Sequence, residues 1–180
     1  GFTFKNIQIV QTPTFADYLR SGIKLTMITS IDFRDSKENA SLHHISKKDP
    51  NSMNEYEKCI SSVGSILTKY DASQEFEVYG FGLKVGNSAI QNFYPLKLNE
   101  SSEKVEGLDG ILKVYRKSLV SISFSVPSNL EPTITNVAAK AINSFSHTQT
   151  YTILLVITNG FVSDIQKVKD AIVQASDAPL

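Results

Sequence analysis

The chain has 180 residues, enough for one domain with a sizeable buried core. Lys plus Arg and Asp plus Glu both number 18, so the formal net charge is zero and no bulk field favours binding to nucleic acid or to an anionic membrane. The single cysteine, Cys59, excludes an internal disulfide framework, which fits a reducing compartment such as the cytoplasm.

Apolar patterning predicts strands that alternate with helices. Residues 2–10 alternate apolar and polar side chains, as a strand with one buried face does. Near-continuous apolar runs are typical of strands buried on both faces, and they occupy residues 23–31, 76–82 and 151–157, with a shorter strand at 122–124. Helical periodicity favours helices over residues 15–20, 55–70, 105–119, 132–145 and 165–175.

The remaining segments carry weaker signals. Residues 34–53 are too irregular for either period, and residues 83–104 are expected to form a loop. Cys59 falls on the apolar stripe of the helix at 55–70, which predicts a buried core thiol. The three histidines fit ordinary loop positions, because no cysteine or carboxylate lies at zinc-ligand spacing from them: His43, His44 and His147.

This order of elements predicts an α/β fold with three layers, Rossmann-like, around a central and mostly parallel sheet. Ligands of such sheets bind outside the carboxyl ends of the strands. Three polar clusters follow strands or turns at this edge, at residues 32–36, 127–129 and 158–160, so we expect them to converge. The chain stops just after its last helix, where a βα series normally continues, and we therefore expect the domain to be truncated before its last strand.

The first polar cluster could carry chemistry. Asp32 ends a buried strand, and Arg34 and Ser36 follow two and four residues later. A carboxylate with hydroxyls from several loops is an oxygen ligand set of the kind that Mg²⁺ prefers. No nucleophile–base pair is evident, because Gly64-Ser65 lies within a helix and Gly80-Phe81-Gly82 lacks the lysine of a phosphate-binding loop. An enzymatic function is therefore not expected.

Seven segments, in chain order, resemble the copine family and its von Willebrand factor A (VWA) domain. They are Phe15-Ala16-Asp17-Tyr18-Leu19-Arg20-Ser21-Gly22, Ser41-Leu42-His43-His44-Ile45, Asn54-Glu55-Tyr56-Glu57, Tyr79-Gly80-Phe81-Gly82, Pro127-Ser128-Asn129 with Pro132, Thr158-Asn159-Gly160 and Ala175-Ser176-Asp177-Ala178-Pro179. The cluster at 32–36 also resembles the metal-ion-dependent adhesion site of VWA domains, Asp-x-Ser/Thr-x-Ser, with Arg34 at the middle hydroxyl.

The resemblance implies a metal site with a reduced ligand set. Its ligands would be Asp32, Ser36, Ser128 and Asn159, and Mg²⁺ is the implied ion. Asn159 replaces an acidic residue, and Arg34 brings a cation to the site. Two like charges about 4 Å apart repel by roughly 4 kcal/mol at an effective dielectric near 20. We therefore expect a degenerate site, and an Arg34–Asp32 ion pair is an alternative way to fill it.

The resemblance also suggests a domain division and a role. Residues 1–13 would be a connector or the end of a preceding C2 domain, and residues 14–180 a VWA domain that is incomplete at its carboxyl end. Copines bind phospholipid through Ca²⁺ in their C2 domains, which lie outside this chain, so the chain itself would recruit protein partners in the cytoplasm, at the plasma membrane or on the cytoskeleton. The alternative is a metal-free structural component that is docked into a cytoskeletal or other large assembly.

Overall fold

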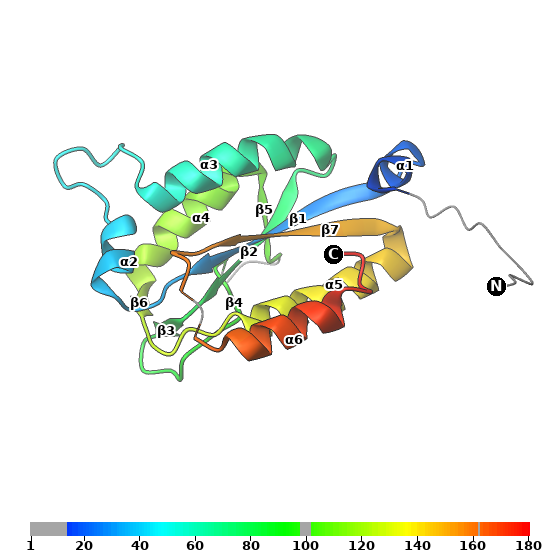
Figure 1. The fold of residues 1–180 in the computed structure, drawn as a ribbon. Coiled ribbons are helices and arrows are strands. Elements are labelled where there is room, and N and C mark those ends of the chain that lie inside the picture. The colour runs from blue at the N-terminus through cyan, green and yellow to red at the C-terminus, as the bar shows by residue number, and fades with distance from the viewer. Residues whose placement is uncertain (1–13, 98–101, 162) are drawn as a thin grey trace, which may run out of the picture.

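A central sheet lies between two layers of helices (Figure 1). The computed structural model describes residues 14–97, 102–161 and 163–180. The strand expected at residues 2–10, and with it the assignment of residues 1–13, lies outside the described residues.

Strand β1 (Lys24–Asp32) is the centre of the sheet. Strand β2 (Glu75–Phe81) pairs with it in parallel on one side and β7 (Thr150–Ile157) on the other. The short strands β4 (Tyr94–Pro95) and β5 (Lys104–Glu106) run antiparallel to β2. A separate antiparallel pair joins β3 (Leu83–Val85) to β6 (Ile122–Phe124). The predicted three-layer α/β fold with a mostly parallel sheet is thus confirmed.

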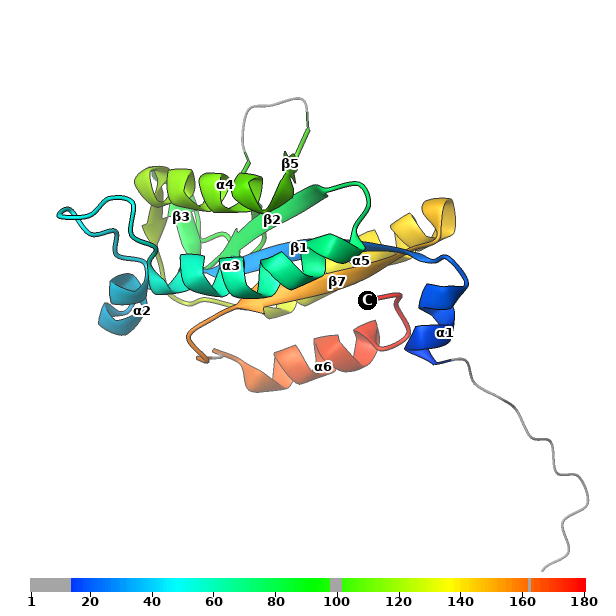
Figure 2. The same ribbon diagram turned by 90° about the horizontal axis from the view of Figure 1, so that it is seen from above.

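The helices are divided between the two faces of the sheet (Figures 1 and 2). Helices α3 (Glu55–Leu67), continued by the 3₁₀ turn η1 (Thr68–Tyr70), and α4 (Gly107–Ser121) cover one face. Helices α5 (Glu131–Thr148) and α6 (Ile165–Ala175) cover the other. The short helices α1 (Phe15–Arg20) and α2 (Lys37–Leu42) precede and follow β1, so they lie at opposite ends of the sheet. No helix within the described ranges has both the length and the apolar character needed to cross a bilayer.

Successive residues of β1 point to opposite faces, and each face has its own core. Met27 and Ile31 belong to the main cluster beneath α3 and α4, together with Tyr115, which is fully buried. Ile28 packs with Tyr79 on the other face. Full burial of one such side chain contributes about 1.5–3 kcal/mol to the free energy of unfolding. Because both faces of β1 are buried in this way, the strand is held from both sides. This places the end of β1 in a rigid frame.

Three expectations about local structure are wrong. Residues 34–53 contain α2, and residues 83–104 contain β3, β4 and the start of β5; these elements have two to six residues, too few to show a period. Cys59 is exposed rather than buried. The reason is the close packing of α3 on α4: a Cβ on Gly64 would lie 2.7 Å from Leu108 Cδ1, so the buried face of α3 runs through Gly64 and turns Cys59 toward solvent.

Candidate functional site

Asp32, the last residue of β1, is fully buried and lies at the meeting point of three segments. Its Oδ1 accepts hydrogen bonds from the backbone N–H of Arg34 at 2.9 Å and from Ser128 Oγ at 3.0 Å. Its Oδ2 accepts one from Thr158 Oγ1 at 3.0 Å. The three predicted polar clusters therefore do converge. We call residues 32–36, 125–130 and 158–161 the loop cluster.

These hydrogen bonds offset part of the cost of burying the charge of Asp32, but the pKa of its carboxyl stays raised. Burial raises the pKa of the Asp32 carboxyl, because a charge is disfavoured away from water. The donors from Arg34, Thr158 and Ser128, and the positive charge of Arg34, act in the opposite direction. Both carboxylate oxygens thus already have partners from the protein itself.

Arg34 contacts Asp32 through its backbone, whereas its side chain contacts Phe161. Besides the N–H bond to Asp32, its carbonyl oxygen accepts a hydrogen bond from Asn39 Nδ2 at 2.8 Å. The guanidinium Cζ lies 3.8 Å from the centroid of the Phe161 ring. The expected alternative of an Arg34–Asp32 ion pair is wrong: the two residues meet through a backbone hydrogen bond, and the guanidinium stacks on the aromatic ring.

Ser36 and Asn159 use their side chains within their own loops. Ser36 Oγ accepts a hydrogen bond from the backbone N–H of Asn39 at 3.0 Å and so caps α2. Asn159 Oδ1 accepts one from the backbone N–H of Phe161 at 3.3 Å. Of the four residues suggested as metal ligands, the structure brings Asp32 and Ser128 into direct contact. Thr158, for which no contact was expected, takes the place next to Asp32 that was expected for Asn159.

Gly82 allows the loop cluster to close. It has φ of +69°, and a Cβ there would lie 2.7 Å from Ser128 Cβ and 3.2 Å from the backbone N of Arg34. Only glycine tolerates this conformation without strain and leaves room for both neighbours. The backbone therefore passes close to both neighbours just after the end of β2.

A buried histidine, His43, forms a hydrogen bond with the backbone of Asp32 and so supports the loop cluster. His43 is 3% exposed; its Nε2 lies 2.9 Å from the carbonyl oxygen of Asp32, and its Nδ1 lies 2.7 Å from the hydroxyl of Tyr115. The carbonyl can only accept, so Nε2 carries the proton and Nδ1 accepts from Tyr115, which in turn accepts from Asn54 Nδ2 at 3.2 Å. Burial lowers the pKa of His43 to about 4. The prediction of an ordinary loop histidine is wrong for this residue.

Asn39 braces the same loop through its side-chain amide. Its Nδ2 donates to the carbonyl of Arg34 and, at 3.3 Å, to that of Asp32, while its Oδ1 accepts from Tyr56 at 2.6 Å. Asn39 and His43, the residue that directly follows α2, are four residues apart, and this spacing places both on the inner side of the helix. That spacing was the available signal for the two residues, and it was missed because α2 was not expected.

Arg116 of α4 forms a salt bridge with α3 and a hydrogen bond with the segment between α2 and α3. Glu57 is 3% exposed, and its two carboxylate oxygens accept hydrogen bonds from Arg116 Nε at 2.7 Å and from Arg116 Nη2 at 2.9 Å. Arg116 also donates to the carbonyl of Pro50 at 2.9 Å. Burial alone would raise the pKa of Glu57, but the hydrogen bonds from Arg116 and from the backbone of Asn54 lower it below its usual value. Helix α4 thereby holds the segment that positions His43.

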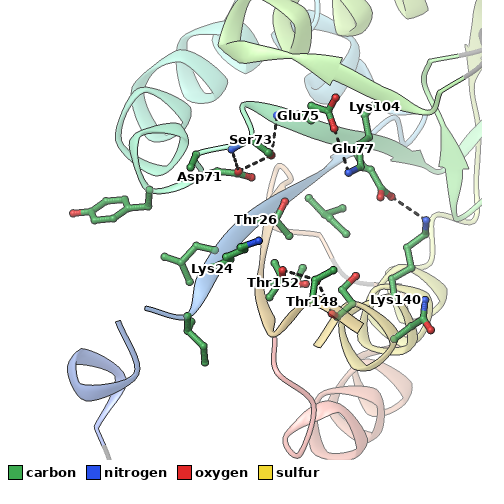
Figure 3. A pocket seen from close by; sticks show the side chains of 18 residues that line it. Lys24, Thr26, Asp71, Ser73, Glu75, Glu77, Lys104, Lys140, Thr148 and Thr152 are labelled. Carbon is green, nitrogen blue, oxygen red and sulfur yellow. Dashed lines mark hydrogen bonds and ion pairs between the residues drawn. The ribbon is translucent and has the colours of Figure 1, made fainter. Parts of the chain in front are cut away.

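A hollow lies at the end of the sheet opposite the loop cluster. It has a volume of about 750 Å³ and opens at the amino ends of β1, β2 and β7 (Figure 3). Acids and bases around it pair with each other: Lys104 lies 3.5 Å from Glu75, and Lys140 lies 2.9 Å from Glu77. Four of the six charged side chains that line it are thus paired. Within the described ranges, no group of three His, Cys, Asp or Glu side chains is placed to hold a metal, here or elsewhere.

Comparison with known proteins identifies the family. The copine family model matches residues 41–180, well over half of the chain. The chain belongs to the copine family. Copine relatives come from distant organisms: Nicotinic receptor-associated protein 1 of Caenorhabditis elegans is 38% identical over 180 residues, Protein BONZAI 1 of Arabidopsis thaliana 36% over 173, and Copine-D of Dictyostelium discoideum 34% over 175.

The matches cover nearly all of this copine chain but only part of each relative. They include 97%, 93% and 93% of the chain, in the same order, and 28%, 29% and 32% of the relatives. The chain thus spans about three-tenths of the length of the curated relatives it matches. The predicted copine resemblance is confirmed, and the α/β fold described above agrees with a VWA-like domain of that family.

Proposed function

We propose that this chain is a non-enzymatic protein-interaction module of a copine-like adaptor and that it contacts partners through the loop cluster. The convergence of three segments on the buried Asp32 carries the proposal, because it builds a rigid polar surface at the edge of the sheet where such folds bind ligands. Ca²⁺-dependent phospholipid binding would belong to C2 domains outside this chain. Such an adaptor would work in the cytoplasm, at the plasma membrane or on the cytoskeleton.

Site-specific photo-crosslinking tests where partners bind. A photoreactive residue at Val126, which is 53% exposed in the loop cluster, is compared with one at Tyr70, which is 59% exposed beside the hollow of Figure 3. In cells that produce the full chain, we expect defined crosslinked products from position 126 and none from position 70. Equal products from both positions, or products from position 70 alone, would reject the loop cluster as the contact surface.

We further propose that the degenerate adhesion site works without a metal. Mg²⁺ demands near-octahedral oxygen ligands, but the Ser36 hydroxyl and the Asn159 amide oxygen are engaged elsewhere, and Arg34 adds a positive charge. The residues present therefore fit the ion poorly. Isothermal titration of the full chain with Mg²⁺ and Mn²⁺, beside an Arg34→Ser/Asn159→Asp variant, tests this. Binding only by the variant supports a relic site, whereas micromolar to low-millimolar binding by the wild type contradicts it.

A permanently docked structural component is the second candidate. The feature that favours it is the saturation of Asp32: its oxygens already accept three hydrogen bonds from the protein, so the site has no evident switch between free and bound states. Fluorescence recovery after photobleaching separates the two roles. A tagged full chain that is built into an assembly should not recover over minutes, whereas a reversible adaptor should recover within seconds.

A further inference from the structure

The unusual group of the loop cluster is the guanidinium of Arg34. At a position where the family pattern has a hydroxyl, the chain carries a permanent cation, because an arginine side chain stays protonated in proteins. The poor fit to Mg²⁺ raises the question of what this cation is for. The backbone of Arg34, the ring that contacts its guanidinium and the chemistry of that group each indicate its role.

First, the origin of the side chain is held in place. The N–H of Arg34 donates to Asp32, its carbonyl accepts from Asn39, and its backbone forms a parallel bridge to Ser125. Asn39 itself is fully buried and held by Tyr56. A partner that binds the guanidinium therefore does not have to order this backbone first, which lowers the entropic cost of binding.

Second, the guanidinium lies over an aromatic ring. Its Cζ is 3.8 Å from the centroid of Phe161, whose side chain is 52% exposed. This contact covers one side of the guanidinium and leaves its two terminal Nη groups, each with N–H donors, free to donate. Within the part of the chain that the structure describes, Arg34 has no ion-pair partner, and its Nε is buried without a hydrogen-bond partner.

Third, the chemistry of a planar guanidinium selects its partner. Two parallel N–H groups match the two oxygens of a carboxylate, and such bidentate pairs are among the strongest hydrogen bonds of proteins. Asp32 cannot serve as this carboxylate, because its two oxygens are already occupied and buried. The neighbouring Asp35 is exposed, and its negative charge would weaken the binding of an external acid.

We propose that Arg34, supported by Phe161, binds a carboxylate side chain of a protein partner directly, in place of a metal ion. The inference rests on the proposed function, since it names the chemistry that the loop cluster recognises. The recognised group is a Glu or Asp side chain on the surface of the partner. Binding does not depend on a divalent cation and weakens as the salt concentration rises.

NMR titration of the full chain with a minimal acidic peptide tests the proposal. The probe is acetyl-Gly-Glu-Gly-amide in the presence of EDTA, and the control is the same peptide with Gln. The reporters are the Nε–H resonance of Arg34 and, for variants that lack it, the backbone amide resonances of the loop cluster. We expect the Glu peptide to shift this resonance with a dissociation constant on the order of tens of millimolar, and the Gln peptide to leave it unchanged.

Variants separate charge from geometry. Arg34→Gln should abolish the response of the loop cluster to the Glu peptide, Arg34→Lys should weaken it about tenfold because the fork is lost, and Asp35→Asn should strengthen it about twofold or more. Phe161→Ala should weaken it while leaving the spectrum of the core unchanged. Equal shifts with the Glu and Gln peptides, no shift at all, or full binding by Arg34→Gln would each overturn the proposal.

The two proposals can fail separately. If position 126 crosslinks to partners but the Glu peptide does not bind, the loop cluster is a contact surface and Arg34 is not its carboxylate receptor. If the Glu peptide binds through Arg34 but position 126 gives no crosslinks, the receptor exists and the proposed role of the loop cluster in cells is wrong.

Discussion

Lowering the pH tests the buried histidine beneath the loop cluster. His43 has a pKa of about 4 in the folded protein, against 6.5 for an ordinary histidine. Between these two values the unfolded chain binds more protons than the folded one, so the free energy of unfolding must fall as the pH falls through this window. The slope approaches 1.36 kcal/mol per pH unit, and from pH 7 to pH 4.5 the loss from His43 sums to about 2 kcal/mol.

Urea denaturation followed by circular dichroism measures this loss. The His43→Gln variant keeps an amide donor for the Asp32 carbonyl but does not titrate, so it should lose about 2 kcal/mol less than the wild type over the same pH range. His44→Gln is the matched control, because His44 is the exposed neighbour, and it should follow the wild type. If His43→Gln lost as much stability as the wild type, the argument that His43 is buried in its neutral form would be refuted.

Two further substitutions test the frame around the site. Gly82→Ala should destabilise the fold by about 2 kcal/mol more than Gly86→Ala in thermal or urea unfolding. Both glycines have positive φ, but only a Cβ at Gly82 would collide with Ser128. Equal losses of stability in the two variants would mean that the loop at Ser128 moves to make room for the Cβ. Arg116→Met should cost about 2 kcal/mol, since it leaves the buried Glu57 without its ion pair, and Arg116→Lys should cost less. If Arg116→Met left the free energy of unfolding unchanged, Glu57 would have to become protonated or solvated at little cost.

Much of the fold could be predicted from the sequence because its core strands are long and apolar. The runs in β1, β2 and β7 have seven to nine residues, enough for burial on both faces to leave a clear pattern. The elements between Ser36 and Met53, and between Leu83 and Glu106, escaped prediction because they are short and are held by caps and pairings with distant residues. The outward turn of Cys59 depends on the contact of Gly64 with Leu108, which no periodicity within one helix contains.

The candidate site was predictable in its position and less so in its contacts. The end of a buried strand identified Asp32, and the turn before α5 identified Ser128. The sequence could not show that Thr158 rather than Asn159 would face Asp32, because neighbouring loop residues point in directions set by the loop backbone. Nor could it show the stacking of Arg34 on Phe161, since the two residues lie far apart in the chain.

The side of β7 that faces away from β1 predicts a distinct pattern of amide hydrogen–deuterium exchange. Thr152 turns its N–H outward and donates to the carbonyl of Pro179 at 2.9 Å, so Leu154 and Val156 also direct their amides outward, while the amides between them face β1. Alternate amides of β7 should therefore exchange at very different rates, fast at Leu154 and Val156 and slow at Ile153 and Leu155. If another strand paired along this side of β7, its hydrogen bonds would slow exchange at Leu154 and Val156, and the alternation in exchange rates would disappear.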